Sequence, residues 1–320
     1  MAINSETNAR ANNAVNVSEL IAQNKKKKSI NNYIERLVPT FLFLLASITV
    51  LTTAGILYTL VSEAVHFFME VPIWDFFTGT ELKPLSQDPQ FGILPLLNGT
   101  LFSSLIAILV AGPIGLMSAI YLSEYASDRV RRVLKPMLEV LAGIPTIVYG
   151  FFAFTFVTPL IRSIWPGVEA TNILSPGLVM GVMIIPMIAS LSEDAMTSVP
   201  NGIREGSLAM GTTKLETTFK VVIPAAFSGI MASFVLGISR AIGETMIVTI
   251  ASGSSKNFTF DITESMQTMT AYIVEVSGGE APAGSTLHYS LYAVALTLFV
   301  FTLIMNLLAK YVSRKFREEY

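Results

Sequence analysis

The stretch ISRAIGETMIV, residues 238–248, places one guanidinium and one carboxylate inside an otherwise apolar run. Arg240 carries a planar, always-charged fork of N–H donors, which matches two oxygens of a tetrahedral oxyanion. Glu244 follows four residues later, so a continuous helix would place it on the same face, about one turn away. A cation and an anion at this spacing suit the binding of a charged solute better than acid–base chemistry. We therefore expect Arg240 to face a path for anions, with Glu244 holding the arginine between transport events.

A buried ion pair that only stabilises the protein is the alternative interpretation. Such pairs stabilise poorly, because desolvation offsets most of the Coulomb attraction. An arginine near the middle of a membrane helix costs about 2.5–3.5 kcal/mol on insertion scales, so it needs a partner or a water-filled cavity. Ionisable residues inside membrane spans commonly mark solute pathways, which favours the transport interpretation for Arg240 and Glu244.

Residues for other chemistry are missing from the sequence. It holds no G-x-x-x-x-G-K-[ST] nucleotide loop, no H-E-x-x-H, no G-x-S-x-G and no cysteine. The two histidines, His66 and His288, lie far apart at the edges of apolar runs, which indicates interfacial positions rather than a metal site. We expect no catalytic residue, no metal and no cofactor in this chain. If transport consumes ATP, a separate chain must bind and hydrolyse it.

Six long apolar runs must position the two charges. The chain is 52% hydrophobic and only 14% charged. Each run reaches the roughly 20 residues that an α-helix needs to cross a bilayer, and a helix satisfies its own backbone groups there. The sequence therefore predicts an all-α, polytopic membrane protein. Its six spans are expected near residues 38–65, 97–121, 138–160, 174–192, 226–250 and 289–309.

Basic residues set the expected orientation. Of the 21 lysines and arginines, 17 fall in the two terminal tails and in the connections between spans two and three and between spans four and five. Positive charge concentrates on the cytoplasmic side, so both termini are expected in the cytoplasm. Residues 1–37 are polar and Asn-rich, and we expect a disordered cytoplasmic tail there. Residues 38–320 would form the membrane domain.

The connection at residues 193–224 carries a motif. Glu205-Gly206-Ser207 is followed by Gly211, which is predicted to end a helix, and then by V-V-I-P ending at Pro224, a predicted break before span five. The pattern resembles the EAA loop of ABC importer permeases, with Gly206 and Ser207 in place of two alanines. The resemblance implies a coupling helix that docks on an ATPase subunit, through Glu205, Gly206, Ser207, Gly211 and Pro224. An ordinary amphipathic connecting helix is the alternative.

Four further stretches are similar to the PstC-type permease subunit of the phosphate ABC importer. They are FGILPLLNGTLFSS (91–104), GLMSAIYLSEYA (115–126), LEVLAGIPTIVYGFFAF (138–154) and RAIGETMIVTIASG (240–253). The resemblance covers about residues 90–310 and the first span. It implies a type I ABC importer permease (MetI-like) bundle in the plasma membrane of a bacterium or archaeon, and it carries Arg240 and Glu244 as transport-sensitive positions.

The same resemblance implies partners and a mechanism. A PstA-type second permease subunit, two copies of an ATPase subunit and an extracytoplasmic phosphate-binding protein would complete an importer that works by alternating access. One arginine does not distinguish phosphate from sulfate or molybdate, so a permease for another oxyanion stays open. An ATPase-independent anion channel or secondary transporter is a further alternative. A membrane enzyme ranks last because catalytic residues are missing.

Overall fold

The computed structural model describes residues 17–279 and 281–315. Contacts divide the chain at Thr59 into two units, and each is described on its own. Residues 1–16, the first part of the expected tail, lie outside the described residues. Helix α2 (Val17–Glu70) contains everything that is described of the first unit.

Residues 17–37 correct the expectation of a disordered tail, because α2 already begins at Val17. This segment is polar, but Lys, Leu, Ile, Glu, Arg, Ala and Gln make up most of it, and it holds neither glycine nor proline. Most of these residues have good helix propensity, and the two strongest helix breakers are absent. The low hydrophobicity of residues 17–37 therefore indicates that they form no buried core, but it does not exclude a helix.

The second unit is built from helices and one small hairpin. Its α-helices are α3 (Ile73–Thr78), α4 (Leu94–Ile120), α5 (Asp128–Ala142), α6 (Thr146–Phe152), α7 (Thr158–Ile164), α8 (Leu174–Thr197), α9 (Asn201–Ala209), α10 (Lys214–Thr217), α11 (Ile223–Ile242), α12 (Met246–Ala251), α13 (Met269–Gly278) and α14 (Thr286–Lys315). Three π-helical turns, η1 (Tyr121–Tyr125), η2 (Ala153–Val157) and η3 (Thr218–Val222), interrupt them. The hairpin pairs β1 (Leu82–Lys83) antiparallel with β2 (Gln90–Phe91), with Leu82 opposite Phe91.

The six predicted spans are confirmed in number. The helices long and apolar enough to cross a membrane are Leu37–Glu70, Leu94–Tyr125, Thr146–Ile164, Leu174–Thr197, Lys214–Ile242 and Thr286–Leu308. The protein is therefore an all-α multi-pass membrane protein, and the two-residue strands of the hairpin do not change that class.

Two span boundaries differ from the prediction. The third span was expected from residue 138, but the chain turns at Gly143-Ile144-Pro145 and the span starts at Thr146. The residues before the turn belong to the separate helix α5. The fifth span was expected at 226–250, but it runs from Lys214 to Ile242. In both cases an apolar run continues across a backbone turn that hydropathy alone does not register.

Pro224 was expected to mark a break before the fifth span, but it lies inside the span, which continues through it. It lies in the first turn of α11, directly after the π-helical turn η3, and the helix continues through it. Pro159 has the same position after η2. A proline cannot donate a hydrogen bond to the preceding turn, and a π turn shifts the backbone pairing by one residue just before it. The wide turns therefore allow both spans to pass through a proline.

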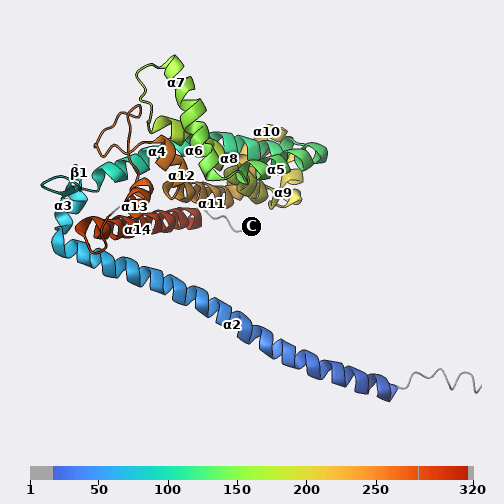
Figure 1. The fold of residues 1–320 in the computed structure, drawn as a ribbon. Helices are drawn as coiled ribbons and strands as arrows, with labels where there is room; N and C mark the ends of the chain where they lie inside the picture. Colours follow the sequence, from blue (N-terminus) through green and yellow to red (C-terminus); the bar gives the residue numbers. More distant parts are fainter. Residues whose placement is uncertain (1–16, 280, 316–320) are drawn as a thin grey trace, which may run out of the picture. The chain divides into compact units, whose positions relative to one another are not determined.

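The centre of the second unit is the α4–α8 pair, whose helices approach closely at glycines. A Cβ added at Gly177 would lie 2.8 Å from Cβ of Ile106, and one at Gly181 would lie 2.7 Å from Cβ of Val110. The G-x-x-x-G of α8 thus serves helix packing, as small residues commonly do in membrane bundles. Helix α11 packs beside this pair, and α14 packs on α11 (Figure 1).

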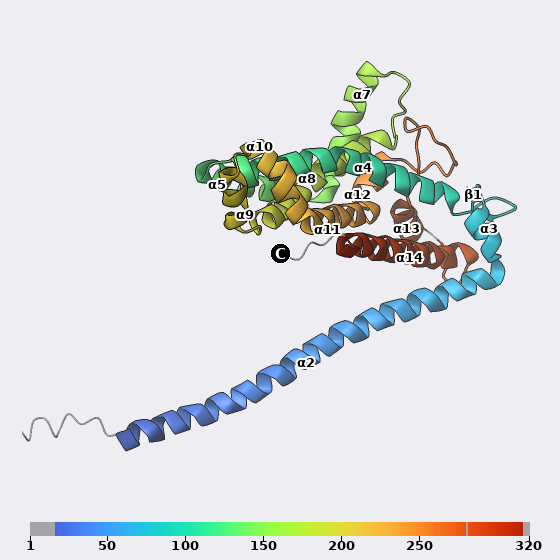
Figure 2. The ribbon, with the colours of Figure 1, turned by 180° about the vertical axis from the view of Figure 1, so that it is seen from behind.

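The second unit has two distinct ends. Both views place α5, α9 and α10 at one end of its bundle and α3 with β1 at the other (Figure 1, Figure 2). Alternation of the spans gives the same result, since the connections after spans two and four lie opposite the connection after span one. Helix α13 lies within the connection between spans five and six and starts at Met269. The hydroxyl of the preceding residue, Thr268, caps it by accepting from the amide of Ala271 at 3.2 Å.

Candidate functional site

Arg240 lies in the last turn of α11 rather than near the middle of a continuous span. The helix ends at Ile242, residues 243–245 are not helical, and α12 starts at Met246. The Arg240 side chain is exposed, and its Nη2 donates a long hydrogen bond of 4.0 Å to Sδ of Met183 on α8. Within residues 17–279 and 281–315 this sulfur is the one acceptor that reaches the guanidinium.

Glu244 does not share a helical face with Arg240, so the predicted pairing is wrong for this structure. Its side chain is buried, and Oε1 accepts from the backbone N–H groups of Met246 at 3.1 Å and Ile247 at 3.5 Å. These amides open α12 and have no helical partner of their own. The backbone oxygen of Glu244 accepts from the Thr270 hydroxyl on α13 at 2.7 Å. Among the described residues no ion pair joins Glu244 to Arg240.

The break between α11 and α12 is held in place by its neighbours. Helix α12 packs on α6, where a Cβ added at Gly150 would lie 3.1 Å from the backbone oxygen of Met246. Irregular backbone at membrane depth occurs where it is buried in protein or lines a water-filled cavity, and broken helices often form solute sites in transporters. The arrangement leaves most N–H donors of Arg240 without a described acceptor, while Glu244 fixes the backbone beside it.

The loop motif forms helix α9 and a tight turn. Gly211 follows α9 with φ +89°, a left-handed conformation that glycine adopts readily, so the predicted helix end at Gly211 is confirmed. Ser207 faces inward, because its hydroxyl hydrogen-bonds to those of Thr212 at 2.8 Å and Thr217 at 3.1 Å. Glu205 and Gly206 face outward, and a Cβ added at Gly206 would meet nothing within 4 Å.

Three large apolar side chains on α9 and in the residues after it are exposed. Leu208, Leu215 and Met210 are exposed, with Met210 at 85%. Exposed apolar groups of this size, gathered beside an open glycine, are typical of a surface that another protein covers.

A cluster of charges joins α5 to α8 at the same end. Glu193 of α8 is fully buried and forms ion pairs with Arg131 and, at 2.9 Å, with Lys135, both on α5. The hydrogen bond to Glu193 raises the pKa of Lys135 above its usual value, although partial burial of the ammonium acts in the opposite direction. From sequence, Arg131 and Lys135 indicated only the orientation of the chain in the membrane, and their ion pairs were missed. Glu193 directly follows an apolar run, and this position was the one signal that its carboxylate would be buried and need basic partners.

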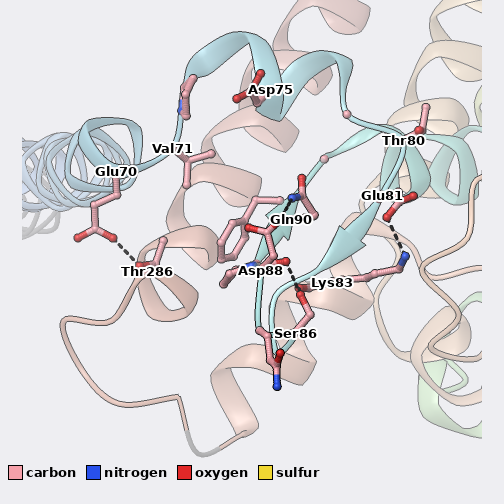
Figure 3. Close-up of a pocket in the computed structure, with 16 residues that line it drawn as sticks. Glu70, Val71, Asp75, Thr80, Glu81, Lys83, Ser86, Asp88, Gln90 and Thr286 are labelled. Atoms are coloured by element: carbon pink, nitrogen blue, oxygen red, sulfur yellow. Dashed lines mark hydrogen bonds and ion pairs between the residues drawn. The ribbon is translucent and has the colours of Figure 1, made fainter.

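The opposite end of the bundle holds a cavity of about 870 Å³, shown in Figure 3. Four acidic side chains line it: Glu70, Asp75, Glu81 and Asp88. Lys83 is the one basic side chain among its lining residues. Lys83 pairs with Glu81 at 2.7 Å, and Thr286 donates to Glu70. The excess of negative charge disfavours the binding of a free anion in this cavity.

Comparisons with known proteins identify a family and relatives of this chain. Residues 111–318 match the family described as binding-protein-dependent transport system inner membrane component. The chain is 32% identical to the probable ABC transporter permease protein YqgH of Bacillus subtilis, over 94% of its own length and 97% of that protein. It is 34% identical to the phosphate transport system permease protein PstC of Mesorhizobium japonicum, over 75% of this chain and 78% of that one.

A solved structure shares the architecture. One chain in the crystal structure of a bacterial alginate ABC transporter, in complex with alginate pentasaccharide-bound periplasmic protein, matches with a TM-score of 0.58. The match covers 85% of this chain and 94% of that chain at 16% identity, so it concerns the fold alone. The expected type I ABC importer permease bundle is confirmed, and so is the resemblance to PstC-type permeases. The chain belongs to the family of binding-protein-dependent transport system inner membrane components.

Proposed function

We propose that this chain is the PstC-type permease subunit of an ATP-driven importer of inorganic phosphate. The observation that carries the proposal is the exposed guanidinium of Arg240 beside the break between α11 and α12, with only a thioether sulfur as its described acceptor. Most of its N–H donors therefore stay available for the oxygens of a phosphate ion. The phosphate permeases among its relatives support the same cargo.

The translocation path needs a second permease chain. Arg240 is exposed in this single chain, and an exposed arginine facing lipid would be costly. A PstA-type subunit covering that face would enclose a wet path between the two chains. Alternating access then requires the two chains to open the path to one side of the membrane at a time.

Coupling to ATP hydrolysis would occur at the 200–224 loop. Glu205 and Gly206 face outward on α9, and Leu208 and Met210 add an apolar surface. We assign this surface to an ATPase subunit, one copy for each of the two permease chains. ATP would be bound and hydrolysed by that partner, and this chain would supply the docking helix.

The proposed orientation puts α5, α9 and α10 in the cytoplasm with both chain termini, and the membrane is the plasma membrane of a bacterium or archaeon. The acid-lined cavity of Figure 3 then faces outside. Because that cavity would repel a free anion, we assign delivery of phosphate to an extracytoplasmic binding protein. The chain contains no cysteine, so single cysteines placed at Gln87 and Glu205 can report opposite sides by labelling of intact cells.

Uptake of labelled phosphate into vesicles that contain the complete complex tests the proposal. Arg240→Lys should impair uptake despite keeping the charge, because the planar fork is lost. Arg162→Lys, at another exposed arginine near a span end, is the matched control and should import normally. Full uptake by Arg240→Lys at normal membrane abundance would contradict the bidentate role.

Two competing functions have distinct outcomes in the same vesicles. Competition by sulfate or molybdate stronger than by unlabelled phosphate would indicate a permease for another oxyanion. Unchanged uptake after substitution of Glu205 and Gly211, or uptake without ATP, would indicate an independent channel or secondary transporter.

A further inference from the structure

The residue before the loop motif, Arg204, points into the protein while its neighbour Glu205 points out. Only 16% of the Arg204 side chain is exposed. Its guanidinium donates to the backbone oxygen of Met196 in the last turn of α8, at 2.6 Å, and to that of Val199, two residues after the helix ends. Arginine binding to the last carbonyls of a helix satisfies acceptors that lack helical partners. Arg204 therefore fastens α9 to the end of α8.

The same guanidinium reaches a third element. Nη2 of Arg204 lies 3.1 Å from Oε1 of Glu124, whose side chain is only 8% exposed. Glu124 belongs to η1, the π-helical turn that ends span two. Among the described residues Arg204 is the one cation paired with Glu124, and a hydroxyl, Ser123 Oγ, donates to the same oxygen at 2.9 Å. A carboxylate this buried would be left uncompensated without its arginine.

A second basic residue of the loop contacts the same turn. Nζ of Lys214, at the start of α10, lies 5.1 Å from the ring centre of Tyr125. Arg204 and Lys214 both line a cavity of about 330 Å³. The loop thus contacts η1 through two cationic side chains beside this cavity. Ile203 packs separately on the apolar cluster around Met196, so α9 keeps an anchor if Arg204 is changed.

The π-helical turn η1, whose Glu124 pairs with Arg204, is continuous with a helix at the centre of the bundle. Helix α4 runs directly into η1 and packs along α8 at its glycine contacts. Helix α8 carries Met183, the residue that contacts Arg240. A displacement of α9 therefore has a continuous route through Arg204 and Glu124 to the helices beside Arg240. Interruptions of an α-helix by a π turn often lie at functional positions, which fits the place of Glu124 in this route.

We propose that Arg204 is the positioning residue that couples α9 to the membrane helices, through its ion pair with Glu124. This inference rests on the proposed function, since it needs an ATPase that docks on α9. Arg204 does not contact that partner through its own side chain. It sets the position of the docking helix relative to spans two and four, so that movement of α9 moves the spans.

The test compares coupling with assembly in vesicles containing both permease chains, the ATPase and the binding protein. Labelled phosphate imported per ATP hydrolysed is measured for Arg204→Gln, Glu124→Gln and the double variant. Each single variant should lower this ratio at least 10-fold, and the double variant should lower it no further, because both remove one pair. Arg204→Lys should recover part of the ratio. Arg132→Gln is the matched control, since within the described part of the chain that exposed guanidinium donates only to the backbone oxygen of Asp128.

Three outcomes would overturn the inference. They are an unchanged ratio in Arg204→Gln, additive losses in the double variant, and a fall in uptake that follows only a loss of co-purified ATPase. A wild-type complex that neither imports phosphate nor hydrolyses ATP would instead refute the proposed function. Hydrogen exchange of the purified chain separates the two cases. Amides of residues 201–211 should exchange at least 10-fold faster in Arg204→Gln than in wild type or Arg132→Gln. Equal rates would contradict the role of Arg204 in holding α9 to α8 and η1.

Discussion

Gly181 on α8 and Gly206 on α9 offer a matched pair of glycine-to-alanine substitutions. Both lie inside helices, so each exchange gains about 0.5–1 kcal/mol in helix propensity. At Gly206 the added Cβ meets nothing within 4 Å, and the gain remains. At Gly181 the Cβ would lie 2.7 Å from Cβ of Val110 and 3.0 Å from the backbone oxygen of Ala107. Overpacking of this kind costs about 1–3 kcal/mol.

The difference between the two variants isolates the contact between α4 and α8, because the propensity gain cancels. At roughly 2–4 °C per kcal/mol, Gly206→Ala should melt about 2–12 °C above Gly181→Ala. Thermal unfolding of the purified chain in detergent, without its ATPase, measures this difference. Wild type should lie between the two variants. Equal melting temperatures, or a lower one for Gly206→Ala, would refute the close approach at Gly181 or the open surface at Gly206.

Three further predictions follow from the same geometry. Arg240→Lys should lower phosphate uptake at least 10-fold, about 1.4 kcal/mol, while membrane abundance stays normal on immunoblots. Gly150→Val should also lower uptake, because its side chain would collide with the backbone of α12, and Gly167→Val, whose Cβ contacts only the Trp165 ring from 3.6 Å outward, should not. Glu193→Gln should reduce stability by about 1–3 kcal/mol in thermal melts at pH 8, because Arg131 loses its carboxylate partner and Lys135 keeps only its ion pair with Asp194 at 3.0 Å. The pKa of Lys135 is raised above 10.5, so the stabilisation by its ion pair is complete below pH 10.5 and declines as the pH rises through the pKa of the folded protein. The gap between wild type and Glu193→Gln should therefore narrow in strongly alkaline solution, and a gap that widens there would contradict this assignment.

The six spans could be predicted from sequence because each needs only a long apolar run. Their exact limits could not, since an apolar run continues through backbone turns. Gly143 and Pro145 separate α5 from α6, and Gly243 ends α11, yet all three lie in stretches without a change of hydropathy. Gly243, three residues after the basic Arg240, was a usable signal for the end of α11.

The candidate site was predicted in its residues but not in its geometry. Arg240 and Glu244 were identified because charges are rare in spans, but their pairing assumed one straight helix. The break at residues 243–245 turns Glu244 toward the amides of α12 and leaves Arg240 exposed. Arg204 and Glu124 lie 80 residues apart in sequence. Only the folded arrangement of α8, α9 and η1 brings them together, so no local pattern could have assigned their contact.

Helix α8 connects the two ends of this arrangement, and its sequence allows it to bend between them. Met183 lies 13 residues before Met196, which is about 20 Å along a helix at 1.5 Å per residue. Pro186 lies between them and cannot donate to the backbone oxygen of Val182, so the helix is weakest one residue from the contact with Arg240. On its C-terminal side α8 is fixed to α5 by Glu193 and to α9 by Arg204. If α9 moves during transport, the displacement would act first on the C-terminal part of α8, and bending at Pro186 would shift Met183, which contacts Arg240.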